Sequence, residues 1–203
     1  MPTTSRYVRR VGALAAAVAL SLALTSCVSD GSTTIASDVA PAPGRTIEAT
    51  PGAMTDLAGY RIAVVVPDDS AGSDTLLAAV RRFAESSGAD LQEFIAPVSS
   101  DDPVGEALVE AIDSGADVVV GLGEGVVGVF DFETGKILDQ QVLVIGGQLA
   151  EPTENVTAVI WPGATAREPS DDESVTIERG VDALAAGVTS IRAGETGVVL
   201  SLP

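Results

Sequence analysis

Three short runs of β-branched and apolar residues restrict the fold of this 203-residue chain more than any other feature. The runs occupy residues 61–66 (RIAVVV), 116–121 (ADVVVG) and 141–147 (QVLVIGG). Runs that are apolar throughout, without alternation, are typical of strands buried on both faces of a parallel sheet. The segments between them carry apolar residues at helical spacing, as at 74–85 and 103–114. Strands that alternate with helices predict an α/β fold, in which helices cover both faces of the sheet.

The remaining patterns extend this domain over residues 58–203. Further strands are expected at 91–95, 156–161 and 198–202, and a further helix at 173–188. The prediction is therefore a doubly wound, mostly parallel sheet of about six strands. One segment, 124–138, leaves two alternatives open: its β-branched and aromatic composition favours a hairpin, whereas the alternation of the chain favours a helix.

The N-terminal residues 1–26 resemble a lipoprotein signal peptide. Three arginines precede an uncharged, mostly apolar stretch at 11–24. As a helix this stretch would span about 21 Å, which is short of the roughly 30 Å hydrocarbon core of a bilayer. The residues that follow, LTSC at 24–27, resemble a bacterial lipobox, in which the cysteine receives a diacylglyceryl group and becomes the first residue. We therefore expect Cys27 to be lipidated and to anchor the protein on the outer face of the bacterial cytoplasmic membrane.

The segment 27–57 that follows is rich in Ser, Thr, Ala, Pro and Gly, and no helical or strand period persists in it. We expect it to be a flexible tether between the lipidated cysteine and the folded domain. Removal of residues 1–26 takes away three arginines and no acidic residue, so the formal charge falls from −18 to −21. Such a chain repels nucleic acid and anionic headgroups, so no nucleic-acid partner is expected.

The residue types also limit the chemistry. The chain has no histidine, and Cys27 is its one cysteine. This excludes histidine-dependent triads and histidine-ligated zinc sites, and a lipidated Cys27 leaves no thiol for catalysis. No constellation of residues supports an enzyme, and we expect no metal site and no cofactor.

Candidate ligand-binding residues follow the predicted strands, because ligands of open parallel sheets bind beyond the carboxyl ends of the strands. Glycines let the backbone approach a ligand there, aspartate and serine bond to hydroxyl groups, and a tryptophan can stack on a ring. The candidates are Asp68, Asp69, Ser70, Ser73, Asp74, Gly123, Glu124, Trp161 and Arg167.

Several phrases, among them GYRIAVVVPD, LVEAIDSGADVVVGLG, QVLVIGG, NVTAVIW and ERGVDALAAGV, resemble the basic membrane protein family. These are type 1 periplasmic-binding-protein lipoproteins that deliver purine nucleosides to ABC transporters. The resemblance runs from about Gly59 to the end and covers the first lobe of a two-lobe protein. The chain departs from the family pattern at two places. Its first ligand loop, DDSAGSDTLL, has no aromatic residue, and it has Glu124 where the family commonly has Phe.

The resemblance implies a membrane-anchored substrate-binding protein of an ABC importer, for nucleosides or similar small solutes. The implied partners are the bilayer through acylated Cys27, an ABC transporter permease and a partner that supplies a second lobe. The alternative is a non-transport envelope lipoprotein that uses the α/β lobe as a protein-interaction module.

Overall fold

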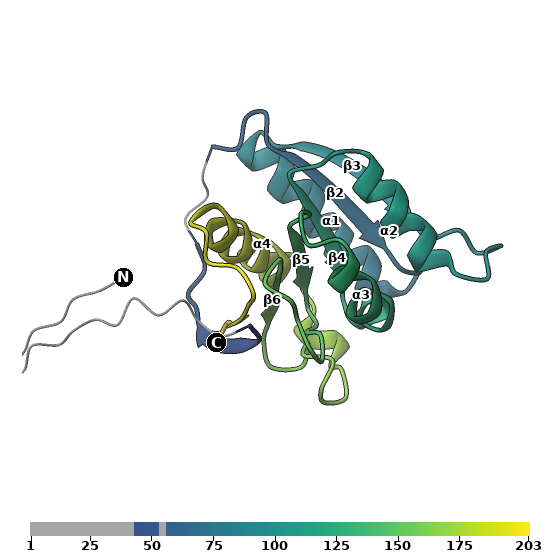
Figure 1. The fold of residues 1–203 in the computed structure, drawn as a ribbon. Coiled ribbons are helices and arrows are strands. Elements are labelled where there is room, and N and C mark those ends of the chain that lie inside the picture. The colour runs from purple at the N-terminus through teal and green to yellow at the C-terminus, as the bar shows by residue number, and fades with distance from the viewer. Residues whose placement is uncertain (1–42, 53–55) are drawn as a thin grey trace, which may run out of the picture. The chain divides into compact units, whose positions relative to one another are not determined.

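Seven parallel strands form one sheet in the computed structural model, which describes residues 43–52 and 56–203 (Figure 1). The predicted signal peptide and Cys27 lie outside the described residues, and the expectations for them stay predictions. The strand order is β1-β7-β6-β5-β4-β2-β3, and every neighbouring pair is parallel. The strands are β1 (Arg45–Glu48), β2 (Arg61–Val66), β3 (Asp90–Ile95), β4 (Val118–Leu122), β5 (Val142–Ile145), β6 (Val156–Ile160) and β7 (Val198–Ser201).

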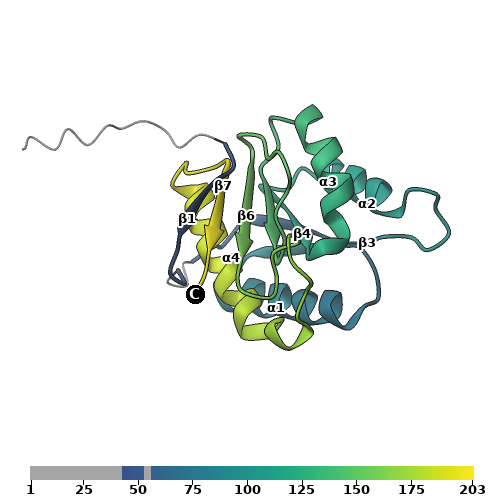
Figure 2. The same cartoon turned by 90° about the horizontal axis from the view of Figure 1, so that it is seen from below.

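Helices cover both faces of this sheet, which confirms the predicted doubly wound α/β fold. Figure 2 shows α1 and α4 on one face and α2 and α3 on the other. The helices are α1 (Ala71–Ser87), α2 (Pro103–Asp113), α3 (Val127–Glu133) and α4 (Ile177–Arg192), with short 3-10 turns η1 (Glu124–Val126), η2 (Thr134–Lys136) and η3 (Asp172–Ser174).

The two faces carry separate hydrophobic cores, and this explains why the strands are apolar throughout. In β2, Val64 packs into the core beneath α1 and α4, whereas its neighbour Val65 packs into the core beneath α2 and α3. Phe83 and Leu184 fill the first core, and Phe130 is fully buried in the second. Because successive side chains of a strand point to opposite faces, neither face of such a strand can be polar.

Local signals set where the helices begin. The Ser70 hydroxyl accepts the Ser73 backbone N–H at 3.2 Å, so α1 starts at Ala71, earlier than the predicted residue 74. Helix α2 starts at Pro103, as the apolar spacing predicts, and the Asp102 carboxylate caps it by accepting the Gly105 N–H at 3.2 Å. The Thr176 hydroxyl caps α4 in the same way, which moves that helix four residues later than predicted.

The ambiguous segment 124–138 is helical, as η1, α3 and η2. Strands β4 and β5, which it connects, are parallel neighbours, and a tight hairpin cannot join parallel strands. Its apolar residues are used in packing: Val126 and Phe130 are buried against the sheet. Tertiary packing therefore outweighs the strand propensity of this segment.

The seventh strand, β1, lies inside the segment 27–57, where a tether without any strand was expected. It pairs with β7, with Ile47 opposite Leu200, and Ile47 packs against the core beneath α1 and α4. The Gly44 N–H also donates to the Gly197 carbonyl at 2.7 Å. Four residues with one large apolar side chain are too few to show a strand pattern. They form a strand because they hydrogen-bond to β7, about 150 residues away in the sequence. By covering one side of β7, β1 protects an edge of the sheet.

Within the described ranges, no helix is both long enough and apolar enough to cross a membrane.

Candidate functional site

A cavity of about 210 Å³ lies at the carboxyl ends of the strands, where the chain leaves β2, β4, β5 and β6. After β2 the chain first adds β3 on one side and then β4 on the other, so the strand order reverses between β2 and β4. Open α/β sheets bind their ligands at such a switch point. The floor of the cavity is apolar and its polar walls come from three loops; the polar lining residues are Asp68, Ser70, Ser73, Glu124, Thr165, Ser170 and Asp172.

Asp68 is held in place by the start of α1. Its Oδ1 accepts the Ser70 backbone N–H at 3.0 Å and the Ser73 hydroxyl at 2.7 Å. The Ser70 hydroxyl in turn donates to the Ser73 oxygen at 3.1 Å. Hydrogen bonds from Ser70, and then from Ser73, lower the pKa of Asp68 below its ordinary value of 3.8, so this carboxyl is ionised at neutral pH. Within the described part of the chain both bonds end on Oδ1, which leaves Oδ2 free to accept from a ligand.

Gly125 allows the loops after β2 and β4 to meet beside the cavity. A Cβ atom at this position would lie 2.8 Å from Cγ of Pro67 and 3.2 Å from Oδ2 of Asp68. Ala166, which also lines the cavity, has φ 56° and is the one non-glycine residue with positive φ among those the structure describes. A strained backbone of this kind is kept only where its surroundings hold it, and here it forms part of the cavity wall.

The lining of the cavity is acidic. Asp68, Glu124 and Asp172 contribute carboxylates, and no lysine or arginine is found among the described residues that line it. The Ser170 hydroxyl donates to Glu124 Oε2 at 3.5 Å, a long bond that connects the loops after β4 and β6. Residues 43–52 and 56–203 contain no group of three or more acidic, histidine or cysteine side chains arranged to hold a metal ion. The cavity therefore suits a ligand that donates hydrogen bonds or carries positive charge, and it disfavours an anion.

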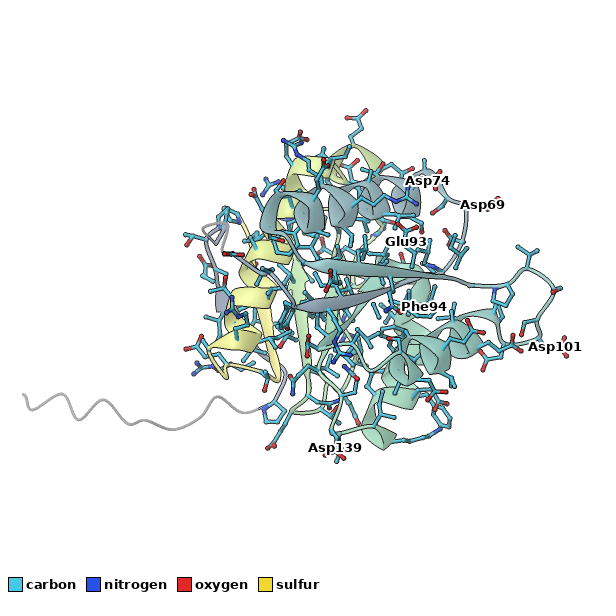
Figure 3. The ribbon with its side chains drawn as sticks, turned by 90° about the horizontal axis from the view of Figure 1, so that it is seen from above. Asp69, Asp74, Glu93, Phe94, Asp101 and Asp139 are labelled. Atoms are coloured by element: carbon cyan, nitrogen blue, oxygen red, sulfur yellow. The ribbon has the colours of Figure 1, made fainter. Side chains whose placement is uncertain are left out.

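Five of the nine sequence-predicted residues line the cavity together: Asp68, Ser70, Ser73, Gly123 and Glu124. Asp69 and Asp74 are exposed and are not part of the lining. Figure 3 shows both of these side chains near the start of α1, at the outside of the molecule.

Trp161 and Arg167 lie elsewhere. Trp161 is 1% exposed, packs in the core beneath α1 and α4, and donates its indole N–H to the Ser174 carbonyl at 3.0 Å. It is therefore not available to stack on a ligand, and we remove it from the site. The Arg167 guanidinium donates to the Leu149 carbonyl at 2.8 Å and borders a separate cavity of about 630 Å³.

Thr165, Ser170 and Asp172 were not among the predicted site residues. They belong to the acidic segment between β6 and α4, which folds back through a hydrogen bond from the Asp171 N–H to the Gly163 carbonyl, 2.8 Å long. Composition marks this loop as polar, but its path decides which side chains reach the cavity. No local pattern in the sequence distinguishes them from Asp69 or Asp74.

No protein-family model matches this chain, and neither does any curated protein. Among solved structures, the chain is similar to a solute-binding protein of an ABC transporter system from Aeropyrum pernix K1, with 21% identity, a TM-score of 0.43, and coverage of 51% of this chain and 29% of that one. It is also similar to a transcriptional activator of the comK gene from Bacillus halodurans, with 13% identity, a TM-score of 0.42, and coverage of 71% and 54%.

A third similar structure is the LacI family transcriptional regulator CCPA from Weissella paramesenteroides with bound sucrose. The identity is 14%, the TM-score is 0.39, and the match covers 70% of this chain and 57% of the regulator. The chain thus spans less than three fifths of each of these structures. Since all three TM-scores are below 0.5, the fold assignment rests on the strand order and helix layers described above.

Proposed function

We propose that the α/β domain is a lobe that binds a small solute, and that the solute donates hydrogen bonds to Asp68, Glu124 and Asp172. The observation that supports this most is the cavity itself, because it combines an apolar floor with carboxylate walls at the switch point of the sheet. Ala166 and Val175 are partly exposed apolar residues of the lining and offer contacts for a ring, and the carboxylates offer acceptors for hydroxyl groups. A nucleoside has both features, in agreement with the resemblance to the basic membrane protein family.

The size of the cavity limits how tightly one lobe can hold such a solute. About 210 Å³ is less than the roughly 300–1,000 Å³ of typical ligand pockets. The lobe covers one side of the solute, and a second lobe from a partner would cover the other. For the isolated chain we expect a Kd of about 1 mM, which corresponds to roughly −4 kcal/mol.

The test is a titration of the full chain with purine nucleosides, followed by NMR chemical shifts. Binding should be weakened by Glu124→Gln together with Asp172→Asn, which remove two acceptors from the wall. The matched control is Asp69→Asn together with Asp74→Asn, two exposed carboxylates close by that lie outside the lining. Equal binding by both double variants, or no shift change at the cavity with any nucleoside, would contradict the proposal.

We further propose that the lobe works as a lipoprotein of an ABC importer, anchored through acylated Cys27 and delivering its solute to a permease. The lipobox-like LTSC at 24–27 supports the anchor. Such a role needs no reaction and no cofactor. Cys27→Ser should move the protein from the membrane fraction to the soluble fraction, because one lost lipid attachment removes the anchor. A variant that stays with the membrane would exclude lipidation at this cysteine as the means of attachment.

A further inference from the structure

Another hollow, which shares no lining residue with the solute cavity, lies between α2 and the segment that follows α3. Its volume is about 450 Å³. Figure 1 shows α2 and α3 next to each other on the same side of the sheet. Its apolar lining comes from Leu108, Val109 and Ile112 of α2 and from Ile137 after η2. Leu108 is buried, but Val109 is 57% exposed, so the hollow opens to solvent as a groove with an apolar centre.

Some of the large exposed apolar side chains of the domain lie in or beside the lining of this groove. Of the five found among the described residues, Val109 lines the groove, Phe132 and Leu138 each adjoin a lining residue in the sequence, and Ile95 and Val98 do not. Phe132 on α3 is 70% exposed, and Leu138 is 60% exposed. Single exposed apolar residues are ordinary, but several beside one groove mark a surface that binds another molecule.

The rim of the groove is acidic. Glu106 and Glu110 lie one helical turn apart on the exposed side of α2. The other two carboxylates of the lining are already bonded, Asp102 to a backbone N–H of α2 and Glu133 to Lys136. Among the described residues that line the groove there is no lysine or arginine. Lys136 pairs with Glu133 at 2.9 Å, so it does not neutralise Glu106 and Glu110. Like charges at i and i+4 destabilise a helix, and a cationic partner would remove this repulsion.

We infer that the α2–α3 groove docks an amphipathic, basic helix of a partner protein. The apolar face of that helix would cover Val109, and its lysine or arginine side chains would reach Glu106 and Glu110. Helices bind in apolar grooves in this way through side chains spaced at i, i+3, i+4 and i+7. Since α2 has 11 residues and a length of about 16 Å, a partner helix of three turns spans the groove.

The charge also argues against other occupants of the groove. A second copy of this chain would bring the same carboxylates against Glu106 and Glu110, because a two-fold interface uses the same patch twice. An anionic lipid surface would be repelled by the same groups. A cationic partner is the one whose charge is complementary.

The test uses the full chain and a fluorescent synthetic helix of leucine and lysine, about 14 residues long, with its leucines on one face. Binding is measured by fluorescence anisotropy. Glu106→Lys with Glu110→Lys, and separately Val109→Asp, should each weaken binding roughly tenfold. All three residues are exposed, so the variants should fold. The control is Glu85→Lys with Asp90→Lys, the same change of net charge at exposed positions outside the groove, which should change binding less than about twofold.

Three results would overturn the inference. The first is no binding of the peptide to the unmodified chain. The second is equal weakening by the groove and control variants, or equal binding of a scrambled peptide of the same composition, since general acidity would then explain the effect. The third is a loss of self-association in the Val109→Asp variant during sedimentation, which would assign the groove to a second copy. None of these results depends on whether the chain binds nucleosides.

Discussion

Replacement of Gly125 by alanine tests how the solute cavity is built. The new Cβ would lie 2.8 and 2.9 Å from two ring carbons of Pro67, and 3.2 Å from the Asp68 carboxylate. Pro67 is buried and its ring is rigid, so the collision is relieved only if the loop after β2 or the loop after β4 moves. Gly128, three residues later in α3, is a matched control, because a Cβ there meets no atom within 4 Å.

The two substitutions should have opposite effects on stability. In a helical segment alanine is favoured over glycine by about 1 kcal/mol, and this gain applies to both positions. At Gly125 the crowding against Pro67 opposes it by about 1–3 kcal/mol, the usual cost of extra volume in a packed site. We therefore expect Gly125→Ala to lower the free energy of unfolding by up to about 2 kcal/mol, and Gly128→Ala to raise it by up to about 1 kcal/mol.

Urea unfolding of the full chain measures this difference, with the fluorescence of the single tryptophan, Trp161, as the probe. The midpoint should fall for Gly125→Ala and rise for Gly128→Ala, with the same m-value for both. Gly125→Ala should also weaken nucleoside binding, since it moves Asp68. Equal stabilisation by the two alanines would show that the loops after β2 and β4 are not in contact, and would refute this account of the cavity.

Two further predictions concern single side chains. Hydrogen bonds from Ser70 and Ser73 lower the pKa of Asp68, so the stability that its ionised form adds should be present above pH 3.8 and lost as the pH falls through the lowered pKa. Asp68→Asn should then cost up to about 1 kcal/mol at pH 7 and progressively less as the pH falls through the lowered pKa, measured by urea unfolding; a cost that does not change with pH would contradict the role of the charge. Trp161→Phe removes buried volume and the bond to the Ser174 carbonyl, and should lower stability by about 1–3 kcal/mol in thermal unfolding. An unchanged Tm would mean that the indole is not packed in the core.

The candidate site was predictable where a residue directly follows a strand. Asp68 and Glu124 lie within two residues of the ends of β2 and β4, so the direction of a parallel sheet brings both to the same edge. Asp69 adjoins Asp68 but is not part of the lining, and a rule based on strand ends cannot separate such neighbours. Asp172 reaches the cavity only because a loop of more than ten residues folds back over the sheet edge.

The sequence by itself determined the parallel α/β class and the start of α2 at Pro103, because these depend on runs of apolar residues and on local signals such as the cap at Asp102. Only the tertiary structure decided the helix at 124–138, the strand β1 and the burial of Trp161. In each of these cases the deciding contact comes from a distant part of the chain: the sheet beneath α3, β7 beside β1, and the core and the Ser174 carbonyl around the indole. Such contacts leave no local pattern, since the energy that selects them appears only when the distant segments have been brought together.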